Sequence, residues 1–174
     1  FFFKQKTAYE IPKRDWSSDV CSSDLDAFDG SQLWTHAGLG ETASILGAAS
    51  PAEDGGVVVV PYSSGELVAL RVENGLVLWS DSLVTQRRTD IVSSLADIRG
   101  RPAIDRGRVF AMSHSDMLVS IDLRSGQRVW EREIGGIESP WVAGPVIYVV
   151  SGNQELVAIS RDTGRILWVT QLPR

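Results

Sequence analysis

Lysine and cysteine are missing from most of this 174-residue chain. All three lysines lie within residues 1–25, and so does the only cysteine, Cys21, whereas residues 26–174 carry 13 arginines and neither of the other two residue types. A single cysteine excludes an internal disulfide and a cysteine-rich metal centre. The contrast in basic residues also indicates that the two parts of the chain do not share a coding bias.

Residues 1–25 lack a regular apolar period as well. The stretch FFFKQKTAYEIPKRDWSSDVCSSDL shows neither the alternation of a strand nor the 3.6-residue period of a helix. Back-translation of residues 4–11 and 15–25 gives strings that resemble the two constant parts of a sequencing adapter. We therefore expect residues 1–25 to be a non-native, adapter-derived segment that contributes nothing to folding, and residues 26–174 to be the native domain.

Excess positive charge and long apolar runs are absent too. Residues 26–174 contain 18 acidic residues against 13 arginines, and the net charge of the chain is -5. An acidic balance without a basic stripe argues against nucleic acid as the main partner. No apolar run approaches the roughly 20 residues that a membrane helix needs. No window combines helix caps with a long helical period, so helix is nearly excluded.

What the chain does contain is an internal repeat. The segments LVALRVENGLVLW (67–79), LVSIDLRSGQRVW (118–130) and LVAISRDTGRILW (156–168) each alternate apolar residues and then place a tryptophan four residues after a glycine. A degenerate copy, AFDGSQLW, occupies residues 27–34. The structural positions of the repeat are Gly30, Trp34, Gly75, Trp79, Gly126, Trp130, Gly164 and Trp168.

Each repeat predicts a β-hairpin preceded by two further short strands, as in GRPAID and RVFAMSHSDM before the second hairpin. The tryptophans are 45, 51 and 38 residues apart, close to the roughly 40 to 50 residues of a propeller blade. The predicted fold is all-β, a β-propeller fragment of four-stranded blades with about three complete blades plus part of another; a β-sandwich is the alternative. In a propeller, Trp79, Trp130 and Trp168 are expected to be mainly buried at the seams between blades.

These residues carry a resemblance to known families. The glycine-to-tryptophan hairpin, with acidic positions such as Asp122 and Asp162 ahead of the glycine, is similar to the PQQ-like propeller repeat of quinoprotein dehydrogenases and of many non-enzymatic propellers. The order LGAASP, SSGELVALRVENGLVLWSDSL, RRTDIVSSLADIRGRP and VSIDLRSGQRVWEREIGG resembles the BamB family. The arginine-rich, alanine-rich composition resembles that of an alphaproteobacterial member. The resemblance covers residues 26–174, part of the eight blades of that family.

The BamB resemblance implies a non-catalytic scaffold of the outer-membrane β-barrel assembly machinery, the BAM complex. Its implied partners are the barrel-assembly protein BamA and unfolded outer-membrane proteins. It also implies a periplasmic lipoprotein that is held at the outer membrane by a lipid anchor absent from this stretch. No cofactor, metal ion or catalytic residue is implied.

An enzyme is the alternative reading of the repeat. A PQQ-dependent quinoprotein dehydrogenase needs a catalytic aspartate near a calcium ion and, usually, a vicinal cysteine pair, and residues 26–174 show neither. The sequence SHSD (113–116) contains the residue types of a hydrolase triad, but neighbours at a hairpin tip do not converge on an oxyanion hole. A binding or sensor propeller with the same repeat is the remaining alternative.

Residues 83–100, LVTQRRTDIVSSLADIRG, form an unusually long connection between predicted blades. By resemblance this loop contributes to docking on BamA, and Asp97 falls where an acidic interface residue is expected. Arg99 departs from the family pattern, because the better known members carry a second acidic residue there. Arg87 and Arg88 are candidates for hydrogen bonds at that interface, and a solvated charge pair is the equal alternative for them. The candidate partner-binding residues are Leu39, Arg87, Arg88, Asp97 and Arg99.

Overall fold

The computed structural model describes residues 21–26, 28–37, 49–84, 98–114 and 117–173, in which every helix-or-strand element is a β-strand. A two-stranded sheet comes first, from β1 (Cys21–Leu25) and β2 (Gln32–Ala37). The first four-stranded sheet holds β3 (Ala52–Asp54), β4 (Val57–Pro61), β5 (Glu66–Arg71) and β6 (Val77–Ser82). The second holds β7 (Ala103–Asp105), β8 (Arg108–Ser113), β9 (Met117–Asp122) and β10 (Arg128–Arg132). The third holds β11 (Trp141–Ala143), β12 (Val146–Val150), β13 (Glu155–Ser160) and β14 (Ile166–Gln171).

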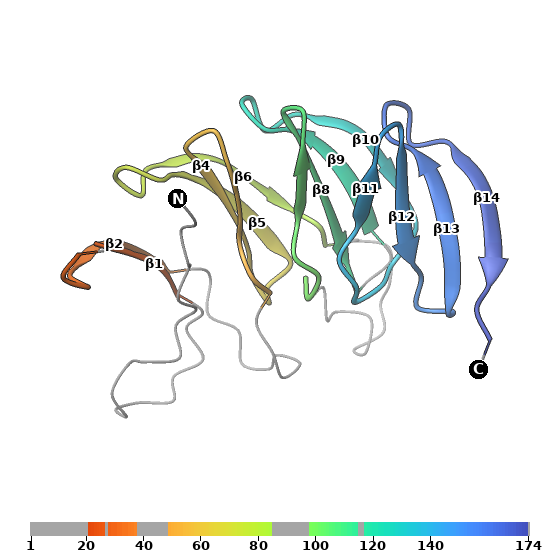
Figure 1. Ribbon diagram of the computed structural model, residues 1–174, viewed down its shortest axis with the longest axis horizontal. Coiled ribbons are helices and arrows are strands. Elements are labelled where there is room, and N and C mark those ends of the chain that lie inside the picture. The colour runs from red at the N-terminus through yellow and green to blue at the C-terminus, as the bar shows by residue number, and fades with distance from the viewer. Residues whose placement is uncertain (1–20, 27, 38–48, 85–97, 115–116, 174) are drawn as a thin grey trace.

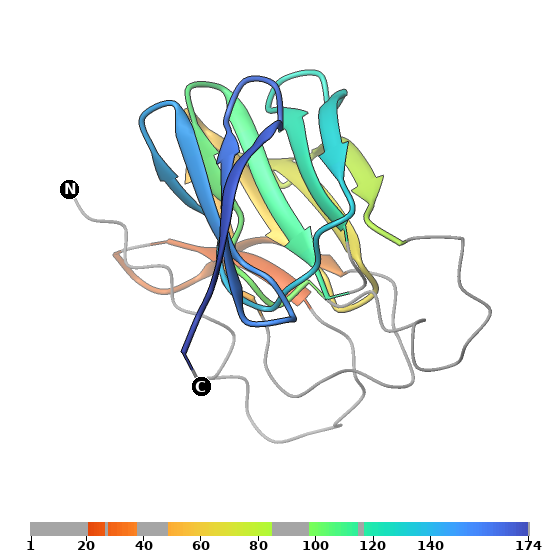
Figure 2. The same cartoon turned by 90° about the vertical axis from the view of Figure 1, so that its right-hand side faces the viewer.

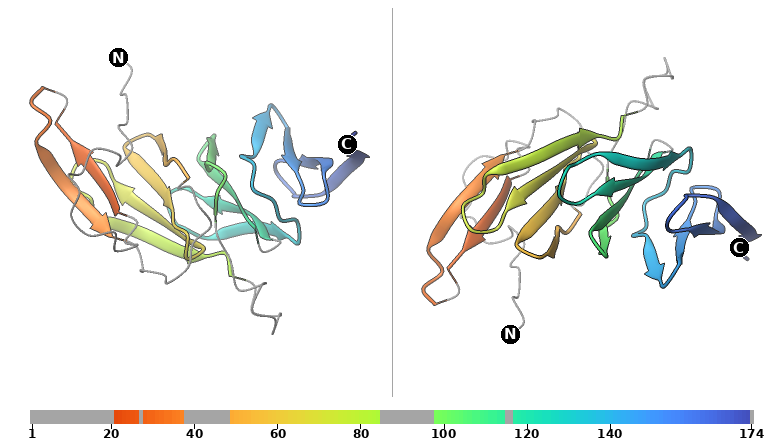
Figure 3. Two further views of the ribbon diagram at one scale, coloured as in Figure 1. Left: turned by 90° about the horizontal axis from the view of Figure 1, so that it is seen from below. Right: turned by 90° about the horizontal axis from the view of Figure 1, so that it is seen from above.

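Each four-stranded sheet is an antiparallel meander in which spatial order equals chain order. The sheets stand side by side in sequence, from β1–β2 at one end to β11–β14 at the other (Figures 1 and 3). The predicted all-β propeller fragment with four-stranded blades is therefore confirmed. The part of the chain that the structure describes contains no helix long and apolar enough to cross a membrane.

A bulge recurs one residue before each tryptophan of the repeat. In the first four-stranded sheet Leu70 pairs with Val77 and Ala69 with Trp79, so Leu78 has no partner in the register. The other three sheets show the same irregularity beside their tryptophans. A bulge re-aims the side chains of its strand and increases the local twist. The bulge turns each tryptophan toward one face of its sheet, while the residue just before the tryptophan, which has no partner in the register, stays exposed.

The core lies between the sheets. On β8, Val109 and Ala111 pack in a cluster shared with the first four-stranded sheet, whereas Phe110 and Met112 pack in a cluster shared with the third. Alternate residues of a strand point to opposite faces, so each central strand serves two seams. Both faces being buried explains the almost uninterrupted apolar runs of β4, β5, β8 and β9.

The segment expected to be non-native overlaps the first strand. Residues 21–25 form β1 and pair antiparallel with β2. Such pairing is made by backbone groups, which nearly every residue carries, so it does not decide the origin of the sequence. Residues 1–20 lie outside the described residues, and the non-native origin of residues 1–25 stays a prediction.

Candidate functional site

Each tryptophan of the first three repeats packs on the glycine turn of the following repeat. The indole Nε1 of Trp79 donates to the carbonyl of Leu123 at 2.8 Å, three residues before Gly126. The same bond joins the neighbouring pairs of sheets, at 2.7 Å from Trp34 to Val72 and at 2.9 Å from Trp130 to Arg161. At every seam between described sheets, one indole ring thus covers the next glycine turn and donates a hydrogen bond to it.

The glycine at each seam is required by the ring that covers it. Gly126 has a φ of +71°, and a Cβ at that position would lie 2.5 Å from Cγ of Trp79. Gly75 and Gly164 stand in the same relation to Trp34 and Trp130, with closest distances of 2.6 Å. A side chain at these turns would meet both backbone strain and the indole. The spacing of glycine and tryptophan in the sequence therefore encodes a contact between repeats.

Trp168 departs from the expected burial. Trp79 and Trp130 are each 8% exposed, whereas Trp168 is 44% exposed. The prediction of a mainly buried ring is wrong for Trp168, because no described element lies against its side of the β11–β14 sheet (Figure 2). The ring lies beside Tyr148 instead, with centroids 5.9 Å apart.

The first seam is the name we give to the interface between the first and second four-stranded sheets, and the second seam is that between the second and third. Charged side chains tie the outer rim of the first seam. Arg128 of β10 donates from Nε and Nη2 to the two carboxylate oxygens of Asp81 on β6, at 2.7 and 2.9 Å. It also bonds Glu131 at 2.7 Å. The bonds to Asp81, and secondarily to Glu131, raise the pKa of Arg128 above its ordinary value. A bidentate, partly buried pair of this kind fixes the angle between neighbouring sheets.

The second seam has a comparable tie at a different place. Arg161 donates to Asp105 of β7 at 2.7 Å, and Arg132 of β10 donates to the carbonyl of Thr163 at 3.1 Å. The side-chain bond to Asp105, followed by that to Asp162, raises the pKa of Arg161. Both seams are therefore held by a buried apolar centre and an ionic rim.

The segments that join one sheet to the next lie at one end of the molecule, together with the turns between β4 and β5 and between β12 and β13. We call this end the connection face: residues 83–84, 98–102 and 133–140 of the joining segments, and residues 62–65 and 151–154 of the two turns. Backbone hydrogen bonds link these segments, from Leu83 to Gly65 at 2.8 Å and from Gly152 to Gly135 at 2.8 Å. The connection face is accordingly a continuous, internally bonded surface rather than a set of separate loops.

Both ends of the long predicted docking loop are anchored at this face. Leu83 and Ile98 are buried in the cluster between the first and second four-stranded sheets. A side chain at Gly100 would clash with the carbonyl of Glu138, and the Arg101 N–H donates to Ser139 Oγ at 2.8 Å. The two ends of the loop are therefore fixed at one seam.

Of the candidate partner-binding residues, Arg99 alone is among those the structure describes. It is half-buried between Ile98 and Gly100 on the connection face. Leu39, Arg87, Arg88 and Asp97 lie outside the described residues. The connection face contains further polar groups that sequence reasoning did not select, because an isolated Ser or Glu in a turn carries no distinctive signal.

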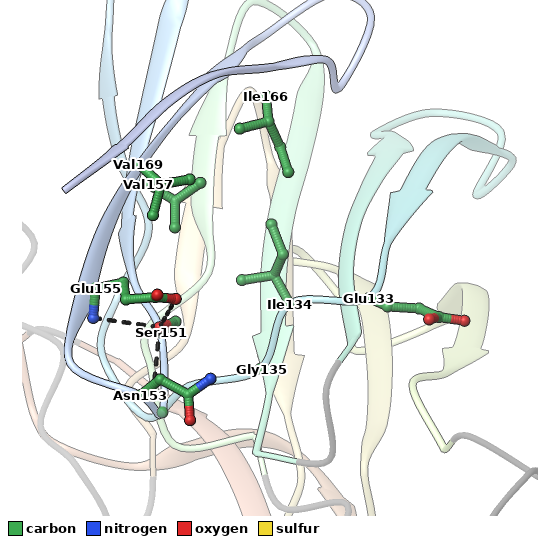
Figure 4. Close-up of a pocket in the computed structure, with 10 residues that line it drawn as sticks. Glu133, Ile134, Gly135, Ser151, Asn153, Glu155, Val157, Ile166 and Val169 are labelled. Atoms are coloured by element: carbon green, nitrogen blue, oxygen red, sulfur yellow. Dashed lines mark hydrogen bonds between the residues drawn. The ribbon is translucent and has the colours of Figure 1, made fainter. Parts of the chain in front are cut away.

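A pocket of about 190 Å³ opens at the connection face beside the second seam. Ile134, Val157, Ile166 and Val169 give it an apolar side, while Glu133 extends away from them (Figure 4). The polar side is made by Ser151, Asn153 and Glu155; Ser151 Oγ donates to Glu155 Oε2 at 3.4 Å.

The pocket exists because the two seams are filled differently. Leu83 follows Trp79 by four residues and is fully buried, whereas Ile134, at the same distance after Trp130, is only partly buried. In the first seam Met117 packs against the core; the equivalent position before the apolar run of β13 is Glu155. A carboxylate must keep contact with water, so the second seam stays open there.

Within the described residues, no three His, Cys, Asp or Glu side chains are grouped closely enough to hold a metal ion. The connection face instead offers a hydrogen-bonded surface of polar and apolar groups at one end of the row of sheets.

Four-stranded antiparallel meanders, repeated side by side and locked by a tryptophan on the next glycine, define the chain as a β-propeller of PQQ-like repeats. A family model described as "Outer membrane protein assembly factor BamB" matches residues 17–170. The chain belongs to that family.

Comparisons with individual relatives agree with this family assignment. Outer membrane protein assembly factor BamB of Shigella dysenteriae is 33% identical over 125 residues, which is 72% of this chain and 32% of the relative. BamB of Escherichia coli K12 is 32% identical over the same shares, and that of Yersinia pestis is 31% identical over 83% of this chain and 37% of the relative. The chain thus spans about a third of the length of these relatives.

Solved structures agree on the fold. The crystal structure of BamB from Moraxella catarrhalis superposes with a TM-score of 0.79 at 24% identity, over 89% of this chain and 46% of that chain. Quinohemoprotein alcohol dehydrogenase from Comamonas testosteroni superposes with a TM-score of 0.72 at 17% identity, over 87% of this chain and 32% of that chain. The blade architecture is therefore shared by assembly factors and enzymes.

Proposed function

We propose that this chain is part of a non-catalytic scaffold that acts in outer-membrane protein assembly by binding a BamA-type barrel-assembly protein through the connection face. The observation that carries the proposal is the family match over residues 17–170. The scaffold would work in the periplasm at the outer membrane, and unfolded outer-membrane proteins would be further partners.

The anchoring of the long connection supports this role. A docking element binds with less loss of entropy when its base is rigid, and Leu83, Ile98 and Gly100 are held by packing at one seam. Arg99 comes immediately at that fixed end, so its charge would be presented to a partner from a fixed position. Asp97 would add an acidic contact, Arg87 and Arg88 would contribute hydrogen bonds, and Leu39 an apolar contact.

The pocket supports the same face as a binding surface. Its apolar side would accept an aliphatic side chain of the partner, and its polar side, with Glu155, would select a neighbouring basic or amide group. Partner contacts commonly combine an apolar anchor with a polar rim. The pocket lies beside the second seam and the anchored ends of the long connection lie at the first, so one partner could cover both.

The test is a titration of the purified barrel-assembly protein against the intact protein and its charge variants. Asp97→Arg should weaken binding about fivefold to thirtyfold, the range expected for an interface charge between rim and centre. The matched control is Glu73→Arg, which reverses an exposed charge in a hairpin turn at the opposite end of the sheets.

Three results would count against the proposal. Unchanged affinity in both Asp97→Arg and Arg99→Glu would remove the long connection as the interface. An equal loss in Glu73→Arg would show that net charge, rather than this face, governs binding. Bound quinone with dehydrogenase activity in the intact protein would replace the scaffold by an enzyme.

A further inference from the structure

The second seam lacks the arginine that bridges the first. Arg128 and Glu131 of β10 lie on the side of their sheet that faces the first seam, and the Arg128 guanidinium bonds both Glu131 and Asp81 of the neighbouring sheet. The register places Ile166 and Val169 of β14 at the equivalent positions of the second seam. Two aliphatic side chains that line the pocket thus replace an ionic group.

No described cation of the chain takes the place of that arginine. Asp81 stands two residues after its repeat tryptophan, and Arg132 occupies the same position at the second seam. Arg132 donates instead to the carbonyls of Gly164 and Thr163 in the next hairpin, at 2.6 and 3.1 Å. The described residues that line the pocket include two glutamates and no basic residue. The pocket is therefore open to a cation from outside the chain.

Glu155 gives the pocket a carboxylate that has no cation beside it. It is half-buried, and its Oε2 accepts a hydrogen bond from Ser151 Oγ at 3.4 Å (Figure 4). Glu155 takes part in none of the ion pairs within the described residues, whose acidic members are Asp81, Asp105, Glu131 and Asp162. Hydrogen bonds to an ionised carboxylate are stronger than neutral ones, and partial shielding from water strengthens them further. A basic donor would therefore bind favourably at Glu155.

Size and shape limit what can enter the pocket. Its volume is about 190 Å³, whereas pockets for small molecules begin at roughly 300 Å³. Its apolar side consists of aliphatic side chains and its polar side includes the carboxylate. Long basic side chains lay their methylene stems along apolar surface and keep the charged head at a polar edge. The pocket therefore matches one lysine or arginine side chain.

We propose that the pocket receives one arginine or lysine side chain from the surface of the barrel-assembly partner, with its stem against Ile134 and Val169 and its charged head on Glu155. This contact rests on the proposed function and narrows it, since a single side chain would fill both sides of the pocket. The partner would then supply at the second seam the cation that Arg128 supplies at the first.

The experiment titrates blocked single amino acids into the intact protein and follows the backbone amide chemical shifts of Gly152 and Asn153. N-acetyl-lysine methylamide should bind about threefold to tenfold more tightly than N-acetyl-norleucine methylamide, which has the same stem without the ammonium group. N-acetyl-arginine methylamide should share this advantage. Glu155→Gln keeps the shape of the side chain and an acceptor for Ser151, and should make the lysine and norleucine probes equal. Glu73→Gln is the matched control, because it removes the same charge from an exposed hairpin turn and should retain the lysine preference.

Several results would overturn the proposal. Equal binding of the lysine and norleucine probes to the wild type would show that the pocket selects only an aliphatic stem. A lysine preference that survives Glu155→Gln, or one that is lost equally in Glu73→Gln, would place the cation elsewhere. Unshifted amides at Gly152 and Asn153 would mean that the pocket binds neither probe.

A titration of the barrel-assembly protein separates this contact from the proposed function. Glu155→Gln should weaken its binding by the same threefold to tenfold, roughly, that divides the two probes. A loss in Asp97→Arg without a loss in Glu155→Gln would retain the scaffold and reject the pocket as a contact. An intact protein that does not bind the barrel-assembly protein at all would instead reject the scaffold, whatever the probes show.

Discussion

The seams between the described sheets and the free face of β11–β14 contain the same sequence unit in two environments. Trp130 and Trp168 each follow a glycine by four residues and each follow a β-bulge. Trp130 is 8% exposed because the Gly164 turn lies under it, whereas Trp168 is 44% exposed. The unit therefore determines a hairpin by itself but a buried ring only together with the next unit.

The difference shows where the stability of such a fold resides. Repeat proteins gain most of their cooperativity at the interfaces between units. Here the interfaces on the two sides of the β7–β10 sheet each combine an indole, a glycine that must remain glycine, and a charged pair at the rim. A repeat loses all three contributions on a side that has no neighbour.

The largest effect is expected when the tryptophan ring is removed from each of the two environments. Trp130→Ala should lower the free energy of unfolding by about 3 to 5 kcal/mol, because it leaves a cavity in the second seam and removes the shorter of the two hydrogen bonds to the Arg161 carbonyl. Trp168→Ala should lower it by less than about 1 kcal/mol, as for an ordinary surface change. Denaturant unfolding measures both changes, and equal losses would contradict the seam assignment.

The next test addresses the glycine half of the seam. Gly126→Ala introduces positive-φ strain and places a Cβ against Trp79, whereas Gly107→Ala introduces similar strain with open space around it. We expect Gly126→Ala to be more destabilising by about 1 to 3 kcal/mol, the cost of overpacking. Denaturant melts of the two variants give the difference directly. If they coincide, the ring does not constrain the glycine.

Much of this architecture could be predicted from the sequence. Alternating apolar residues and turn glycines located the hairpins, and the recurrence of the unit gave four-stranded blades, since both depend on local patterns. The partner of each tryptophan could not be read in this way: that Trp79 covers Gly126 rather than its own Gly75 is a contact between repeats. The exposure of Trp168 was mispredicted for the same reason, because burial depends on a neighbour and not on the offset.

The candidate site was less predictable than the fold. The length of the connection at residues 83–100 indicated a special segment, but its anchoring by Leu83 and Ile98 follows from packing between two sheets. The pocket depends on Glu155 standing where the neighbouring seam has Met117. A single difference at the first residue of a strand has no periodic signature, so only the comparison of two seams in three dimensions reveals it.

The smallest effect is expected for a polar atom, the Ser120 hydroxyl, on the residue opposite Trp130. Ser120 pairs with Trp130 in the register, where the other two four-stranded sheets have Ala69 and Ala158. It is fully buried, and its Oγ has no hydrogen-bond partner among the described residues.

Burying a hydroxyl without a partner costs free energy that alanine avoids, so Ser120→Ala should raise the free energy of unfolding by about 0.5 to 1 kcal/mol. Ser113→Ala is the control of opposite sign, because the equally buried Ser113 Oγ donates to the Leu83 carbonyl at 3.4 Å and its loss leaves that carbonyl short of a donor. Denaturant unfolding of the two variants and the wild type measures both changes in the free energy of unfolding. A loss of stability in Ser120→Ala comparable to that in Ser113→Ala would mean that the Ser120 hydroxyl is bonded, and that the second seam differs from its neighbour in polarity as well as in packing.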